Sequence, residues 1–141
     1  MNTAIEAPRI YPTFRFLDAA KMIDWLENAF GFTVHACYRD EAGRIVHAEL
    51  AFGSSMIMCG EAKEDAFGEI VSDTAVTGGK SLYIAVDDAD ALYERAHAAG
   101  AAIEQGLTDR DYGSREFICR DPEGNVWCFG TYWPKAHEKA G

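Results

Sequence analysis

The spacing of hydrophobic residues predicts a strand, a helix and three further strands, and this order of elements occurs twice along the chain. In the first half, the run from Ile10 to Phe16 is rich in β-branched and aromatic residues, which predicts a strand. Residues 19–29 carry their apolar side chains on one helical face, with Asp18 as the N-cap and Gly31 as the left-handed residue that ends the helix. Three further strands are expected at 32–39, 45–52 and 56–59.

The second half repeats this order. We expect a strand at 82–86, a helix at 89–99 capped by Asp87 or Asp88, and strands that begin at 101, 115 and 126. Asp18 and Gly31 stand as far apart as Asp87 and Gly100, which predicts a duplicated unit.

The duplication predicts a fold class. Neither unit buries both faces of its sheet alone, so the sequence favours an α+β fold in which two βαβββ modules form curved mixed sheets around a cavity. The expected organisation is one domain over 1–141, with module one at about 8–60, a linker at about 61–79 and module two at about 80–133. The linker shows no sustained period, and we expect it to lie over the cavity.

Charge and composition limit the classes of molecule that this protein is expected to bind. The chain has 13 Lys and Arg against 23 Asp and Glu, a formal net charge of -10, which disfavours nucleic acid and anionic membrane surfaces. No stretch approaches the roughly 20 apolar residues that cross a bilayer, and residues 1–8 lack the features of a secretory signal. Four well-separated cysteines are typical of free thiols in a reducing compartment, so we expect a cytoplasmic protein.

Several segments carry a more specific pattern. These are the helix that ends in 29–32, the strand 49–53, the segment 112–117, and above all the hairpin and aromatic strand Asp-Pro-Glu-Gly-Asn-Val-Trp-Cys-Phe-Gly at 121–130. Together they resemble the vicinal oxygen chelate superfamily, which contains glyoxalase I, the bleomycin-resistance proteins, fosfomycin-resistance enzymes and extradiol dioxygenases. The resemblance covers 10–133 and implies paired βαβββ modules in a homodimer, with modules exchanged or packed between chains.

The resemblance also implies four positions for metal ligands, on the first, third, fifth and eighth strands. Here they hold Tyr11, Glu49, Ser81 and Cys128. One carboxylate, with a thiolate as a second donor, falls short of the three protein ligands of a catalytic zinc site. The resemblance therefore implies the bleomycin-resistance-like branch, which binds its ligands without metal, and we expect no cofactor.

His47 and Glu49 lie two apart on one expected strand and so share a face. Three interpretations stay open for them. They form an atypical divalent-metal site with Cys128, they act as a proton-transfer pair, or they line the cavity.

Strand phase predicts which side chains of the second module face the cavity. Tyr83 shares a face with Ser81, and Val126 shares one with Cys128. The alternate positions are expected to form the core with the helices: Leu82, Ile84, Val86, Trp127 and Phe129.

Tyr112 and Arg115 flank a Gly-Ser turn. The guanidinium is a candidate for holding a ligand carboxylate or phosphate, with the tyrosine stacked on it. The alternative is a surface pair of Arg115 with Glu116 or Asp111.

These features favour a metal-free protein that binds and sequesters an aromatic or amphipathic drug or metabolite, as in antibiotic resistance. The rival is a lyase or isomerase of the same superfamily that uses Glu49 with His47 or a divalent metal. A third hypothesis, an interaction module that acts through residues 60–80, has no motif behind it.

Overall fold

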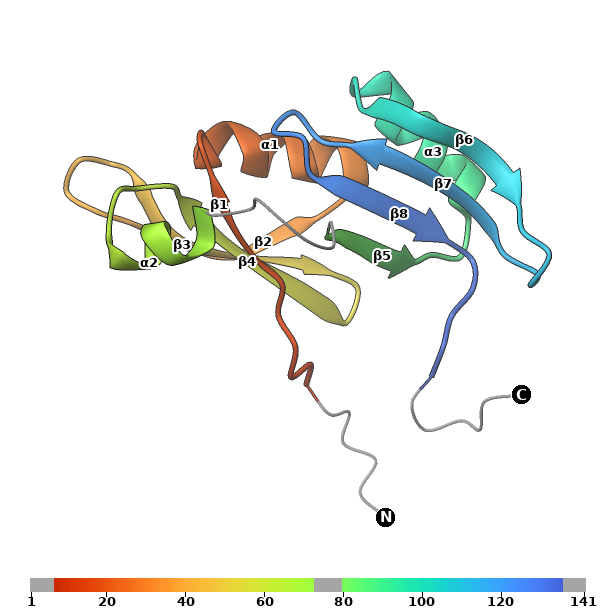
Figure 1. The fold of residues 1–141 in the computed structure, drawn as a ribbon, viewed down its shortest axis with the longest axis horizontal. Helices are drawn as coiled ribbons and strands as arrows, with labels where there is room; N and C mark the ends of the chain where they lie inside the picture. The colour runs from red at the N-terminus through yellow and green to blue at the C-terminus, as the bar shows by residue number, and fades with distance from the viewer. Residues whose placement is uncertain (1–6, 73–79, 136–141) are drawn as a thin grey trace, which may run out of the picture. The chain divides into compact units, whose positions relative to one another are not determined.

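The computed structural model describes residues 7–72 and 80–135, and the chain divides into two compact units. Unit 1 is Met1–Thr77 and unit 2 is Gly78–Gly141. Each contains one four-stranded mixed sheet with a longer helix packed on one face, as the labels in Figure 1 allow the reader to follow. The predicted α+β class and the two βαβββ modules are confirmed.

Unit 1 runs β1 (Thr13–Phe16), α1 (Ala19–Phe30), β2 (Thr33–Arg39), β3 (Ile45–Phe52), β4 (Ser55–Glu61) and α2 (Ala66–Ser72). The sheet order is β1-β4-β3-β2, with β1 parallel to β4 and the other pairs antiparallel. The side chain of Asp18 accepts from the backbone N–H of Lys21, and Gly31 ends α1 with φ 86°. Both caps are therefore where the sequence predicts them.

Unit 2 runs β5 (Ser81–Ala85), α3 (Ala89–Ala98), β6 (Ala102–Asp109), β7 (Arg115–Arg120) and β8 (Val126–Gly130). Its sheet order is β5-β8-β7-β6, and β5 is parallel to β8, as β1 is to β4. The carboxylate of Asp121 accepts from the backbone of its own turn and, at 2.9 Å, from the buried indole N–H of Trp127. The turn that gives the sequence its most specific pattern is thus tied to the core of the sheet.

Each core lies between a sheet and its helix. In unit 1 the buried face of α1 has helical spacing: Ala19, Met22, Ile23, Leu26, Ala29 and Phe30. In unit 2 the core contains Phe117, Trp127 and Phe129, all fully buried. Full burial of a side chain such as phenylalanine stabilises the folded state by about 1.5–3 kcal/mol. The face of the sheet that packs on the helix is therefore the one that excludes water.

The structure settles one predicted alternative and differs from the sequence prediction in two other places. Of the two predicted N-cap candidates for α3, Asp88 is the cap, because its carboxylate accepts from the N–H of Ala91. β1 begins at Thr13, so Tyr11 precedes the strand. The predicted linker contains α2, a helix too short to show a period, whereas its residues 73–79 lie outside the described residues. No helix among residues 7–72 and 80–135 has the length and apolar character needed to span a membrane.

Candidate functional site

Each sheet has an open face, which we define as the face opposite the helix α1 or α3 of the same unit. On the open face of unit 1, the Nε2 atom of His47 lies 3.0 Å from Oε2 of Glu49. Both side chains are half-buried, and the imidazole stacks on Tyr38 with ring centroids 6.2 Å apart. The predicted shared face is confirmed, and the pair is close enough to exchange a proton.

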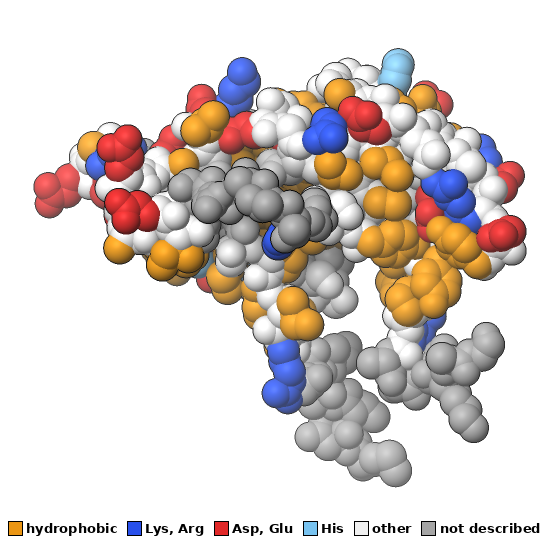
Figure 2. Space-filling view, viewed as in Figure 1, with side chains coloured by type: hydrophobic (Ala, Val, Ile, Leu, Met, Phe, Trp, Pro, Cys, Tyr) orange, Lys and Arg blue, Asp and Glu red, His pale blue; other side chains and the backbone are white. Residues whose placement is uncertain are grey.

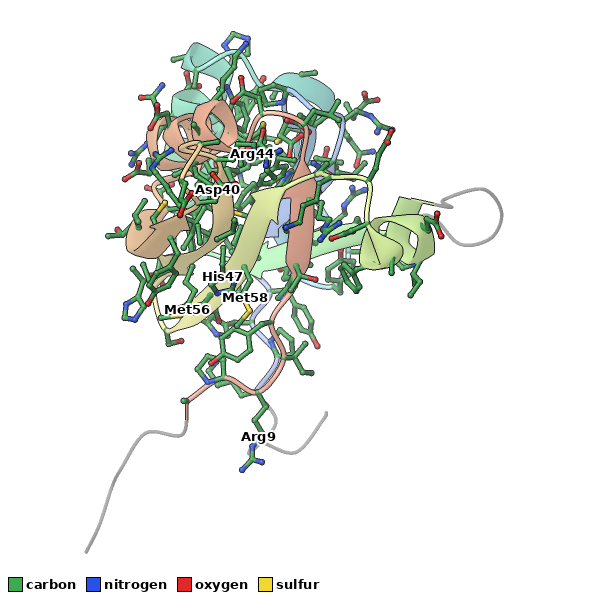
Figure 3. The ribbon with its side chains drawn as sticks, turned by 90° about the vertical axis from the view of Figure 1, so that its left-hand side faces the viewer. Arg9, Asp40, Arg44, His47, Met56 and Met58 are labelled. Carbon is green, nitrogen blue, oxygen red and sulfur yellow. The ribbon has the colours of Figure 1, made fainter. Side chains whose placement is uncertain are left out.

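Two methionines lie beside this pair. Figure 3 shows His47 on β3 next to Met56 and Met58 on β4, whereas Asp40 and Arg44 lie in the turn that leads into β3. Met58 is the register partner of Glu49. Flexible, polarisable thioethers adapt to ligands of different shape, so this face combines a polar pair with an adaptable apolar surface.

A pocket of about 260 Å³ adjoins this face within unit 1. Its walls include Arg15, His47, Met58, Lys63 and Phe67. The wall from α2 is fixed, because the Arg15 guanidinium donates to both carboxylate oxygens of Asp65 at 2.8 and 3.1 Å and lies 4.9 Å from the ring centroid of Phe67. The hydrogen bonds from Arg15 lower the pKa of Asp65 to about 2, so the pair stays charged at neutral pH.

The open face of unit 2 carries a second polar group, centred on Glu116 of β7. We call it the Glu116 cluster and define it by the residues Glu116, Tyr83, Arg110, Tyr112, Gly130 and Tyr132. The glutamate is only 5% exposed, yet three large aromatic side chains of the cluster are open to solvent: Tyr83 at 40%, Tyr112 at 57% and Tyr132 at 51%. Hydrophobic side chains gather on the side of unit 2 that faces the viewer in Figure 2. Exposed aromatic groups around a buried charge are unusual for a plain surface.

Hydrogen bonds fix the cluster. Tyr112 donates its hydroxyl to Oε1 of Glu116 at 2.8 Å, and Arg110 donates from Nε to the same oxygen at 3.3 Å. Tyr83 donates its hydroxyl to the backbone oxygen of Tyr132 at 2.6 Å. The rings of Tyr112 and Tyr132 meet edge to face, 6.0 Å apart.

Gly130 forms the floor of the cluster. A Cβ atom at this position would lie 2.6 Å from the Tyr83 hydroxyl, 2.7 Å from Cγ of Glu116 and 3.0 Å from its Oε2. The tyrosine and the carboxylate therefore converge over bare backbone, and only glycine leaves them room.

Three titratable side chains on this face have raised pKa values and are protonated at neutral pH. The pKa of the Tyr112 phenol is raised, chiefly because it donates to Glu116, and burial raises the pKa of the Tyr83 phenol. The pKa of the Cys128 thiol is also raised, by burial first and then by the nearby Glu116 charge. At neutral pH the face thus offers phenols and a thiol, with no thiolate ligand.

Arg115, a predicted ligand-binding residue, is engaged elsewhere. It lies on the helix side of β7, where its Nε donates to Asp90 of α3 at 2.6 Å and its NH1 donates to Asp109 at 3.1 Å. The expected alternative partners, Glu116 and Asp111, are wrong, whereas ligand binding by Arg115 stays a prediction. Adjacent residues of a strand point to opposite faces, so Arg115 and Glu116 cannot meet.

The remaining predicted residues have mixed outcomes. Tyr11 is half-buried ahead of β1, Ser81 is exposed at the start of β5, and Cys128 is half-buried in β8, with Tyr83 as its register partner. Trp127 and Phe129 are fully buried, which confirms the predicted phase of β8. The ligand-binding roles of Tyr11, Ser81 and Cys128 stay predictions.

The described part of each unit does not supply a metal site. Within residues 7–72 and 80–135 no group of three or more His, Cys, Asp and Glu side chains is arranged to hold a metal ion. Unit 1 offers only the two donors His47 and Glu49, which contact each other. The alternative set that adds Cys128 combines both units and stays a prediction.

Sequence reasoning missed the centre of unit 2. Glu116 entered only as a partner for Arg115, and Arg110 and Tyr132 did not enter. One signal was available: in the strand 115–120 the alternation places Glu116 and Ile118 opposite the buried Phe117 and Cys119, so a carboxylate on the open face was readable from the sequence.

Comparison with known proteins agrees with this architecture. A family model for the Glyoxalase/Bleomycin resistance protein/Dioxygenase superfamily matches residues 13–129. The chain belongs to this superfamily. The match spans both units, and it confirms the resemblance that the 121–130 segment carries most specifically.

Individual members of the superfamily and similar structures span a range of likeness. TioX from Micromonospora sp. ML1 is 31% identical, covers 87% of this chain and 94% of its own, and superposes with a TM-score of 0.70. A protein of Mycobacterium bovis is 28% identical over 125 residues, which span 87% of this chain and 82% of that protein. Fosfomycin resistance protein FosX from Mesorhizobium loti is 16% identical with a TM-score of 0.62 over 94% of this chain and shows the shared fold alone.

Proposed function

We propose that this protein binds and sequesters an aromatic or amphipathic small molecule on the open faces of its two modules, without a metal ion. The observation that supports this most directly is the Glu116 cluster, in which solvent-exposed tyrosines surround a buried carboxylate. Ligand sites are typically apolar and aromatic surfaces with a few fixed polar groups, and this description fits the open face of unit 2.

The superfamily's ligand positions support binding without metal. They hold Tyr11, Glu49, Ser81 and Cys128, with a single carboxylate among them. TioX and FosX share the fold, and FosX is described as a fosfomycin resistance protein, which supports a small-molecule ligand. The proposal includes a bleomycin-resistance-like role in the cytoplasm. It also includes a homodimer of chains whose modules span about 8–60 and 80–133.

The test is calorimetric titration of the intact protein with planar aromatic probes, beginning with the neutral 1-naphthalenemethanol. Tyr83→Ala and Tyr112→Ala should each weaken binding roughly 2- to 10-fold, because each removes an exposed ring from the rim. Ile70→Ala removes a 74% exposed side chain outside the cluster and should leave affinity unchanged. Equal affinities for all three variants would remove the support for this site, and absence of binding by any aromatic probe would overturn the proposed function.

A second candidate function rests on the His47–Glu49 pair. A carboxylate 3.0 Å from an imidazole is suited to proton transfer in a lyase or isomerase reaction. In that case Glu49→Gln should abolish turnover of a superfamily-type substrate while it leaves ligand affinity nearly intact. If the protein binds a ligand that it returns unchanged, and Glu49→Gln changes only affinity, the sequestering function stands.

A further inference from the structure

The carboxylate of Glu116 has two oxygens in different situations. Oε1 receives both of the hydrogen bonds to this side chain, from Tyr112 and from Arg110. Oε2 receives none from the residues that the structure describes, and it lies above the floor at Gly130. The side chain as a whole is only 5% exposed. No fully buried side-chain oxygen among the described residues lacks a hydrogen-bond partner, so Oε2 itself is reached by solvent. A ligand that donates to this oxygen would replace water there with a charge-assisted hydrogen bond.

The hydroxyl groups around this oxygen cannot act as its donors. The proton of Tyr112 is directed to Oε1 of Glu116, and the proton of Tyr83 is directed to the backbone oxygen of Tyr132. A phenol has one proton to give, so both tyrosine oxygens can only accept further hydrogen bonds, and the Tyr83 oxygen already interacts with the Ser114 side chain. The floor of the cluster therefore presents acceptors to an incoming molecule: Glu116 Oε2 and the oxygens of the two tyrosines.

The positive charges nearby do not reverse this polarity. Arg110 also donates to the side-chain oxygen of Gln105 and stands at the part-exposed edge of the cluster. Arg115 is bound to Asp90 and Asp109 on the other side of the sheet. An anionic ligand on the floor would face the Glu116 carboxylate, whereas a cation would meet it together with the faces of tyrosine rings.

From this geometry we propose that the Glu116 cluster selects ligands that carry a protonated amine next to a planar aromatic group. The proposal rests on the proposed small-molecule binding function and gives it a ligand class. The ammonium donates to Oε2 of Glu116 over Gly130, and the aromatic part packs on the rings of Tyr83 and Tyr112.

Three probes of nearly equal shape test the charge requirement: 1-naphthylmethylamine, 1-naphthalenemethanol and 1-naphthoate, titrated calorimetrically into the wild-type protein at pH 7. We expect the amine to bind about 10- to 100-fold more tightly than the alcohol, since a charge-assisted hydrogen bond replaces a neutral one. The carboxylate should bind weakest. This comparison needs no variant and so does not depend on the folding of a substituted protein.

A matched pair of variants then locates the effect. Glu116→Gln should reduce the preference for the amine over the alcohol to about 3-fold or less, because it removes the charge and adds a donor. Glu104→Gln makes the same change of net charge at an exposed glutamate that pairs with Arg120, and it should keep the wild-type preference.

The outcomes separate the two proposals. If the alcohol or the carboxylate binds as tightly as the amine, the ligand class is wrong while the binding function stands. Loss of the preference in Glu104→Gln to the same extent as in Glu116→Gln would also overturn the assignment to Glu116, since net charge alone would explain it. If no probe binds at all, both the binding function and the ligand class are overturned.

Discussion

Replacing Gly130 with alanine probes the floor of the Glu116 cluster directly. The new Cβ would lie 2.7 Å from Cγ of Glu116, whereas carbon atoms in contact prefer about 3.5–4.0 Å. The glutamate must therefore move by about 1 Å, which would lengthen its 2.8 Å hydrogen bond from Tyr112 beyond the hydrogen-bonding range. Tyr83 must move as well, although its hydroxyl is the far end of a flexible side chain.

The energetic consequence follows from two opposing terms. Overpacking of this kind costs about 1–3 kcal/mol, and alanine recovers about 0.4–1 kcal/mol by restricting the unfolded chain, since the φ of Gly130 is not in the left-handed region. We expect a net loss of about 1–2 kcal/mol, or a fall in Tm of roughly 3–8 °C. Urea unfolding at constant m-value gives the free energy, and thermal unfolding gives Tm.

Gly106 provides the matched control. It lies in β6, and a Cβ at this position would meet nothing within 4 Å. Gly106→Ala should therefore leave the unfolding midpoint unchanged or slightly raised, and it should bind 1-naphthylmethylamine like the wild type. A Gly130→Ala protein with wild-type stability and wild-type amine affinity would refute the close convergence of side chains over Gly130.

Three further predictions concern other parts of the two units. Asp121→Ala should lower the free energy of unfolding by about 2–4 kcal/mol in a urea titration, because a buried indole N–H and the N–H groups of the 121–125 turn lose their acceptor; a loss below about 0.5 kcal/mol would contradict this. Cys119, buried and with its thiol pKa raised to about 12 by burial, should not react with Ellman's reagent at pH 8 until the protein unfolds, whereas the exposed Cys37 should react at once, as mass mapping of the labelled thiols can show. The pKa of Asp65 is lowered from 3.8 to about 2, so the stabilising contribution of its carboxylate is present above pH 3.8 and is lost as pH falls through about 2. NMR of the side-chain carboxyl should therefore show a titration near 2, which moves towards 3.8 in Arg15→Gln. A wild-type titration at the ordinary value would show that the Arg15–Asp65 pair is not formed.

The sequence predicts the helices and the strand phases well, because their signals are local. Asp18 and Gly31 cap α1 through contacts within four residues, and the alternation in 126–130 puts Trp127 and Phe129 in the core. The family resemblance also depends on a local pattern, the turn at 121–125 and the strand that follows it.

The candidate site is harder to predict because its contacts join distant positions. Arg15 meets Asp65 fifty residues away, and Arg115 meets Asp90 on a helix that precedes it by 25 residues. No sequence pattern predicts either of these two ion pairs. The short helix α2 begins with a local cap, since the carboxylate of Asp65 accepts from the backbone N–H of Gly68, but its 7 residues are too few to show a helical period.

The parallel pairing of the first and last strands within each unit has a consequence for synthesis on the ribosome. The sheet of unit 1 is complete once β4 has emerged, since β1 pairs with β4 and α1 packs on strands of its own unit. About 70 more residues must be added before β8 can pair with β5, which takes about 4–14 s at roughly 5–20 residues per second. The nascent first module therefore has time to fold while its open face is exposed to solvent. Polar side chains on that face, such as Arg15, His47 and Glu49, reduce the hazard of aggregation during this interval.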